Sequence, residues 1–133
     1  MGYIRSYKNL IAWRKAMDLI EVTYRLTSRF PANERFGLVA QLRRAAVSIV
    51  ANIAEGYGRR TRADYVHFLD IAAGSANEVE AQIPVARRLG SIDETGARPA
   101  LSLISEVHRL LRGLVKKLEA SPKSRVSNQR LTS

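Results

Sequence analysis

The histidine and carboxylate side chains are the groups in this sequence that could bind a metal or carry acid–base chemistry. There are two histidines, His67 and His108, and only His67 has carboxylates at helical spacing, namely Asp64 and Asp70. The sequence contains no cysteine, which excludes disulfides and thiolate metal sites. It also contains no Walker loop and no HExxH, GxSxG or GxGxxG pattern. We therefore predict no metal site and no cofactor.

Polar side chains recur at core-like spacing on two predicted helices. Facing positions of an antiparallel helix pair have residue numbers of near-constant sum, and three polar pairs share one register. They are Arg44 with Glu78, Ser48 with Ser75, and Glu55 with His67. Because a half-buried charge without a partner is costly, we predict an ion pair between Arg44 and Glu78. The predicted polar seam comprises Arg44, Ser48, Asn52, Glu55, His67, Ser75 and Glu78.

This seam has two interpretations. In the favoured one it is structural and fixes the helix register or a contact between subunits. In the other it is catalytic and acts through Glu55, His67 and Glu78. The catalytic interpretation is weaker because the seam has neither a nucleophile nor a metal to work with. We therefore predict that the protein is not an enzyme.

Most of the candidate residues for binding nucleic acid are arginines. Arginine pairs with phosphate oxygens in a bidentate manner, and a neighbouring tyrosine could stack on an exposed base. The densest group of arginines lies in the turn after the second predicted helix. Pairs of arginines are also common on ordinary solvated helices. The predicted nucleic-acid-binding residues are Arg43, Tyr57, Arg59, Arg60, Arg62, Arg87 and Arg88. A further basic group on the fourth helix comprises Arg109, Arg112, Lys116 and Lys117.

The charge balance favours an anionic partner without identifying it. Lys and Arg number 22 against 12 Asp and Glu, which gives a formal net charge of +10. Such an excess attracts polyanions, whether nucleic acid, anionic lipid or an acidic protein. Solvated helix faces in a protein from an arginine-favouring genome would give the same balance.

Apolar residues at alternating steps of three and four predict an all-α protein. We expect helices over about 7–29, 34–56, 62–89 and 95–119, with Gly56 and Gly58 providing a left-handed stop and Pro84 bending the third helix near Gln82. Helices of this length joined by short loops run antiparallel to their neighbours. The expected fold is an up-down-up-down four-helix bundle over residues 1–120.

The remaining residues, 121–133, carry bases and no acids and have few apolar side chains, so we expect a disordered basic tail that adds to nucleic-acid binding. We see no signal-peptide pattern and no run of about 18 apolar residues. Together with the lack of cysteine, this predicts a cytoplasmic protein with no membrane partner.

Two stretches of the sequence carry a family resemblance. They are FPANERFGLVAQLRRAAVSIVANIAEGYGRR and DYVHFLDIAAGSANEVEAQIPVARRLGSI. They resemble the four-helix-bundle proteins encoded in intervening sequences of bacterial 23S ribosomal RNA genes, over about residues 5–118. That family is similar to the accessory protein of diversity-generating retroelements, a basic pentameric barrel that binds nucleic acid and reverse transcriptase. The resemblance implies a homopentamer and signature positions at Arg43, Arg44, Asn52, Glu55, Gly56, Ser75 and Glu78.

We thus predict a non-enzymatic, oligomeric protein that binds nucleic acid through phosphate contacts, with RNA favoured over DNA. The alternative is a protein-interaction module that docks on an acidic partner such as a polymerase. Binding that weakens steeply with salt would favour the first prediction, because neutralising phosphates releases counterions. A complex that survives nuclease treatment would favour the second.

Overall fold

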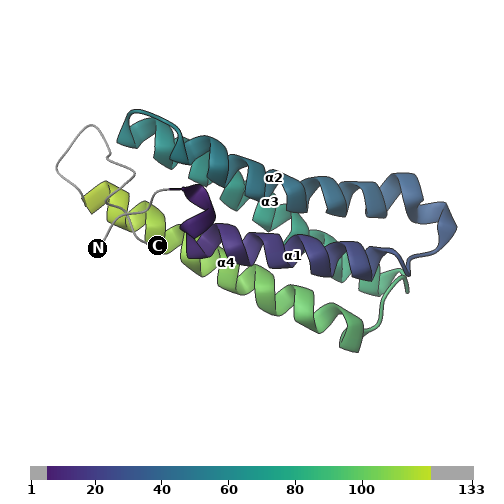
Figure 1. The fold of residues 1–133 in the computed structure, drawn as a ribbon. Coiled ribbons are helices and arrows are strands. Elements are labelled where there is room, and N and C mark those ends of the chain that lie inside the picture. Colours follow the sequence, from purple (N-terminus) through teal and green to yellow (C-terminus); the bar gives the residue numbers. More distant parts are fainter. Residues whose placement is uncertain (1–5, 121–133) are drawn as a thin grey trace.

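Four long α-helices make up the protein in its computed structural model, which describes residues 6–120. They are α1 (Ile11–Thr27), α2 (Ala40–Tyr57), α3 (Arg62–Arg88) and α4 (Glu94–Ala120). Each helix packs against the one that follows it, and α1 also packs against α4, so that the four close into a bundle (Figure 1). The predicted all-α four-helix bundle is confirmed, whereas the predicted tail, 121–133, lies outside the described residues.

The first two helices begin later than the apolar pattern predicts. A short 3-10 turn, Tyr7–Asn9, precedes α1. Before α2 the chain forms a 3-10 turn at Ala32–Glu34 and a π-helical turn at Arg35–Val39. Within the π-helical turn, Gly37 leaves helical geometry with φ −98° and ψ −106°. This departure separates the turn from the regular helix, which starts at Ala40.

Side-chain caps fix the starts of α3 and α4. The hydroxyl of Thr61 accepts a hydrogen bond from the Asp64 amide at 3.1 Å, and the carboxylate of Asp93 accepts one from the Gly96 amide at 2.7 Å. Both caps satisfy amides that have no partner within their own helix. Pro84 does not break α3, which continues to Arg88. The chain then turns at Gly90, whose φ of +82° lies in the left-handed region that favours glycine.

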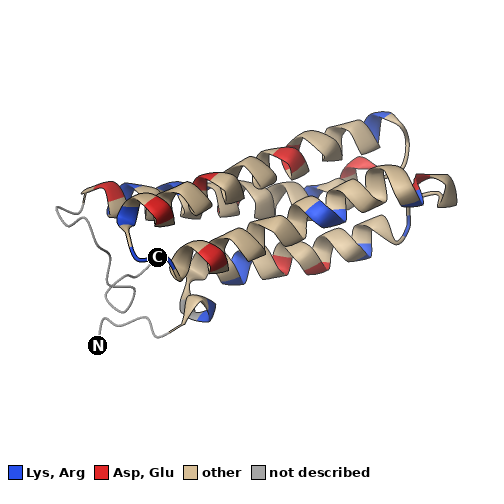
Figure 2. Ribbon diagram, turned by 90° about the horizontal axis from the view of Figure 1, so that it is seen from above, with Lys and Arg blue, Asp and Glu red and all other residues tan. Residues whose placement is uncertain are grey.

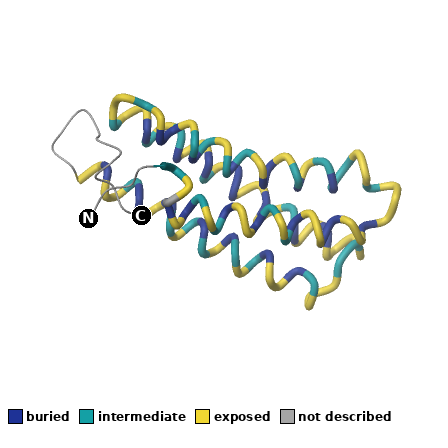
Figure 3. Tube along the Cα trace, in the orientation of Figure 1, coloured by how far each residue is buried: buried dark blue, intermediate teal, exposed yellow. Residues whose placement is uncertain are grey.

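The hydrophobic core runs the length of the bundle (Figure 3). All four helices contribute one buried stripe, and Leu19, Ile49, Leu69 and Ile104 are among its fully buried members. Each such side chain contributes roughly 1.5–3 kcal/mol by leaving water. The core therefore accounts for the fold and leaves the outward-facing side chains available for other roles.

At Gly56, α2 comes into close contact with α3. A Cβ at this position would lie 2.9 Å from the Cβ of Phe68 and 3.2 Å from the backbone oxygen of Tyr65. The predicted left-handed stop at Gly56 and Gly58 is wrong, because Gly58 has φ −82° and Gly90 is the only described glycine with positive φ. Gly56 is thus needed for helix packing and not for chain reversal.

One segment is long and apolar enough to cross a membrane by length and composition. It spans Ala32–Tyr57, with a mean hydropathy of 1.2 in its most apolar window. A helix in the core of a bundle meets the same criterion, and α2 does bury Leu42, Ile49 and Ile53. Its length and composition are therefore weak evidence for a membrane partner. The search of the sequence for a run of about 18 apolar residues had not found this segment.

Alanine substitutions at one crowded glycine, Gly56, and at one uncrowded glycine, Gly113, test this packing. We expect Gly56→Ala to lower the free energy of unfolding by about 1–3 kcal/mol, because the added methyl group must push α3 away. The control is Gly113→Ala in α4, where no described atom outside the neighbouring residues and backbone of the helix itself lies within 4 Å of the added Cβ. There alanine should raise the free energy of unfolding by about 0.5–1 kcal/mol through lower backbone entropy. Urea unfolding measures both, and a Gly56→Ala protein as stable as the wild type would contradict the proposed contact.

Candidate nucleic-acid interface

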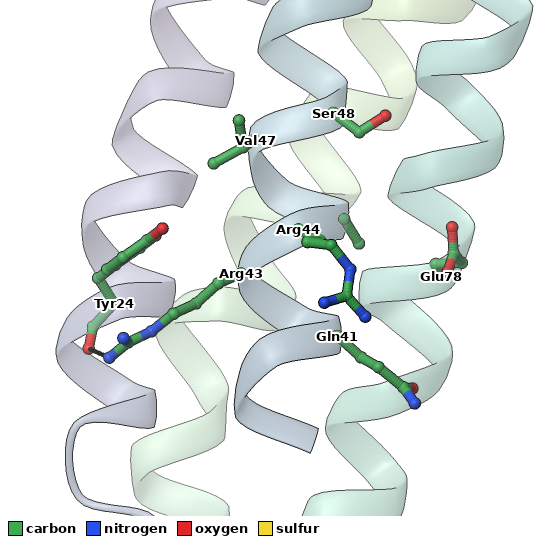
Figure 4. Close-up of a pocket in the computed structure, with 8 residues that line it drawn as sticks. Tyr24, Gln41, Arg43, Arg44, Val47, Ser48 and Glu78 are labelled. Atoms are coloured by element: carbon green, nitrogen blue, oxygen red, sulfur yellow. Dashed lines mark hydrogen bonds between the residues drawn. The ribbon is translucent and has the colours of Figure 1, made fainter. Parts of the chain in front are cut away.

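A groove on the outer side of α2 brings together several of the predicted site residues (Figure 4). Its volume is about 600 Å³. Its polar and charged lining comes from three helices and consists of Tyr24, Gln41, Arg43, Arg44, Ser48 and Glu78. The groove thus contains Arg43, a predicted phosphate-binding residue, and the predicted pair Arg44 and Glu78. The contacts that these three side chains make determine what the groove can bind.

Arg43 extends across to α1. Its Nε donates to the Thr27 hydroxyl at 2.9 Å and its Nη2 to the Tyr24 carbonyl at 3.4 Å, while the guanidinium lies 4.3 Å from the centre of the Tyr24 ring (Figure 4). The Thr27 hydroxyl in turn donates to the Thr23 carbonyl. Arg43 therefore joins α2 to the end of α1 through two of its five N–H donors. These contacts give Arg43 a structural role, and its predicted phosphate contact stays a prediction.

The predicted ion pair between Arg44 and Glu78 is not formed. The two residues line the same groove, but they are not among the ion pairs within 4.0 Å that join described residues. Both are exposed, so water solvates each charge and the expected cost of an unpaired buried charge does not apply.

The neutral part of the predicted seam does join α2 to α3. The hydroxyls of Ser48 and Ser75 share a hydrogen bond of 2.8 Å, and the Asn52 amide donates to the Ser48 hydroxyl at 3.1 Å. Ser75 is buried and Ser48 half-buried, so each hydroxyl needs such a partner. One more contact, from the Gln82 amide to the Gln41 side-chain oxygen at 3.4 Å, continues the seam. Gln41 was missed in the sequence, although it lies three residues before Arg44 and seven before Ser48 on the same helical stripe.

Glu55 and His67 do not meet in a seam. Glu55 forms an ion pair with Arg59, one helical turn further on, and His67 packs edge-to-face against Phe68 with ring centres 5.5 Å apart. Both side chains are exposed. Over residues 6–120, no three His, Asp or Glu side chains form a group that could hold a metal, the trio around His67 included. The residues of the catalytic interpretation thus have separate surroundings.

The turn between α2 and α3 contains arginines in three different states. Arg59 is paired with Glu55 and its guanidinium lies 4.6 Å from the centre of the Phe68 ring. Arg62 is half-buried, and its buried Nη1 has no hydrogen-bond partner among the described atoms. Arg60 is exposed. Of the three, Arg60 is therefore the one most accessible to a phosphate.

Tyr57 cannot stack on a base as the sequence predicted. It is 9% exposed and packs edge-to-face against Tyr7 and Tyr65, with ring centres 6.5 Å and 6.2 Å away. Burial raises the pKa of the Tyr57 hydroxyl above its ordinary value. The ring belongs to an aromatic cluster at the end of the core, which explains why a tyrosine follows Gly56.

Arg87 and Arg88 lie at the opposite end of the bundle from this turn, as an antiparallel arrangement requires (Figure 1). Arg87 forms an ion pair with Glu94 at 3.1 Å, across the connection to α4. Arg88 is exposed, without a hydrogen bond or ion pair in the described part of the chain. The predicted binding residues therefore do not form one patch.

A second groove lies between α3 and α4, away from the residues that the sequence favoured. Asn77 and Glu80 line it from α3, and α4 contributes Ser105, His108, Arg109 and Arg112. The sequence analysis named Arg109 and Arg112 as part of a basic group on the fourth helix, but it did not identify the other residues of this groove. The spacing of the α4 residues, at steps of three and four, was the available signal.

Comparison with known proteins agrees with this architecture. A family model described as "23S rRNA-intervening sequence protein" matches residues 8–113. A crystal structure of a protein of unknown function from the S23 ribosomal protein family of Bacteroides thetaiotaomicron is similar, with a TM-score of 0.72 and 25% identity, over 80% of this chain and 99% of that one. No curated protein matches the sequence. Because the family model covers most of its length, the chain belongs to the 23S rRNA-intervening sequence protein family.

Proposed function

We propose that this protein binds nucleic acid through phosphate contacts and catalyses no reaction. The observation that carries the proposal is the set of exposed arginines without an intramolecular partner in a chain of net charge +10. Within residues 6–120 this set includes Arg60, Arg88, Arg109 and Arg112. Charge-assisted bonds to phosphate oxygens are the interactions that such side chains make best.

RNA is the ligand that we propose in preference to DNA. The description of the family connects its members with intervening sequences of 23S rRNA, which supports RNA as the first ligand to test. Basic and acidic residues lie scattered among one another over the bundle (Figure 2). Phosphate contacts without base readout fit this distribution, because scattered arginines can follow a backbone irrespective of its sequence.

We further propose that several copies associate. Three apolar side chains on α1 and α2 support this, because Met17, Tyr24 and Val47 are 37%, 41% and 43% exposed. Five copies is the number implied by the family resemblance. A ring would repeat each exposed arginine and strengthen the field that attracts a polyanion.

The same apolar side chains favour a second candidate function, a module that docks on another protein. In the most apolar window of Ala32–Tyr57, only 33% of the residues are buried in the bundle. An acidic partner such as a polymerase would pair with the arginines around this surface. A complex recovered from nuclease-treated extract would favour this candidate over nucleic-acid binding.

The salt dependence of RNA binding tests the first proposal. Fluorescence anisotropy of a labelled single-stranded RNA should show tight binding that weakens about 50-fold between roughly 50 and 200 mM salt if about four phosphates are contacted. Arg60→Ala should weaken binding severalfold without changing the melting temperature. Binding that is absent at low salt, or unchanged by salt, would contradict the proposal.

Arg43→Ala is the control for this titration. It removes the same charge as Arg60→Ala, but also the hydrogen bonds to Thr27 and Tyr24. We expect the free energy of unfolding to fall by about 1–2 kcal/mol, with little change in the RNA affinity of the folded protein.

The mass of the nuclease-treated protein in solution tests association. Light scattering should give a multiple of the 14.9 kDa of one chain. Val47→Glu should shift the mass toward one chain, since it places a charge on the apolar surface. A wild-type mass of 14.9 kDa at every protein concentration would rule out self-association.

A further inference from the structure

We propose that the groove between α3 and α4 is the main phosphodiester-binding site of this protein. The groove has a volume of about 390 Å³, within the range of ligand-binding sites in proteins. It is lined by Asn77 and Glu80 of α3 and by Ser105, His108, Arg109 and Arg112 of α4. This inference rests on the proposed function and gives it a place in the fold.

Four residues of α4 turn hydrogen-bonding groups toward one side of the helix. Ser105, His108, Arg109 and Arg112 lie within about one-third of the helix circumference, since each residue advances by about 100°. Ser105, Arg109 and Arg112 are exposed and have no hydrogen bond or ion pair with other described residues. Their hydroxyl and guanidinium groups are donors, and the unesterified oxygens of a phosphodiester are acceptors.

His108 forms the floor of this groove and has an incomplete set of contacts. Its side chain is 16% exposed, and its buried Nε2 has no hydrogen-bond partner among described atoms. The nearest charged group is the Glu80 carboxylate, with Oε1 at 3.5 Å from Nε2. This contact becomes an ion pair only when the imidazole is protonated. Because Nε2 is buried, the donors of α4 that a ligand in the groove can reach are those of Ser105, Arg109 and Arg112.

Glu80 is the only acid that lines the groove, among the residues that the structure describes. Its carboxylate repels a phosphate. The other charged lining residues are two arginines. The groove thus holds two fixed positive charges against one negative charge, and removal of the Glu80 charge should strengthen anion binding.

The basic side of α4 continues beyond the groove. Arg109, Arg112 and Lys116 follow at steps of three and four along one face. They span about 10 Å of helix, comparable to three nucleotides at about 3.4 Å of rise each. This face leads toward the end of the bundle where the turn with Arg60 lies (Figure 1). A strand held in the groove could extend toward that turn, which would account for a contribution from Arg60.

Paired double variants test the groove against a diffuse effect of charge. The groove variant is Arg109→Ala with Arg112→Ala. The control is Arg25→Ala with Arg29→Ala, which removes two exposed arginines at the end of α1. With the labelled single-stranded RNA at about 100 mM salt, the groove variant should bind at least about tenfold more weakly, and the control within about twofold of the wild type. Glu80→Gln should bind about threefold more tightly, and circular dichroism melts should be alike for all four proteins.

Each outcome bears on a different proposal. If the wild type binds RNA and both double variants lose affinity equally, the groove is overturned and a diffuse positive field accounts for binding. Weaker binding by Glu80→Gln would also count against the groove. If the wild type binds no RNA even at low salt, the proposed function itself fails, and the groove fails with it.

Discussion

The close packing of α2 against α3 determines where the polar side chains of both helices lie. Gly56 lets the two helices approach until only a hydrogen atom fits between its Cα and Phe68. Further along the same interface, the Ser48 and Ser75 hydroxyls bond across it. Small residues at both points set the register of the pair. That register leaves Arg44 and Glu78 on the outside, where water replaces the ion pair that burial would have required.

A large net charge overstates how much of the surface can bind an anion. Three of the predicted phosphate ligands have partners within the chain: Arg43 on α1, Arg59 with Glu55, and Arg87 with Glu94. Such arginines join one element to the next. Among the described residues, the exposed arginines without such a partner are spread over the bundle, and of these only Arg109 and Arg112 line a groove together with a serine and a histidine. Charge alone therefore predicts the class of partner, and the arrangement of side chains decides the place of contact.

The sequence predicts the fold well because helical periodicity is local. The apolar stripes and the Ser48–Ser75 register follow from spacing along one or two helices. The choice of partner for a long side chain is not local. Arg43 contacts α1 because the tertiary packing of α1 against α2 brings Thr27 beside it. The groove beside His108 likewise combines residues of α3 and α4 that no single stripe connects.

Phenylglyoxal modification of the arginines, with and without bound RNA and read by mass spectrometry, reports which guanidinium groups an RNA backbone covers. If RNA binds in the groove between α3 and α4, it should protect Arg109, Arg112 and Arg60, while Arg25 and Arg29 react as before. Protection confined to arginines outside α4 and the α2–α3 turn, or no protection under conditions where RNA is bound, would contradict binding in this groove.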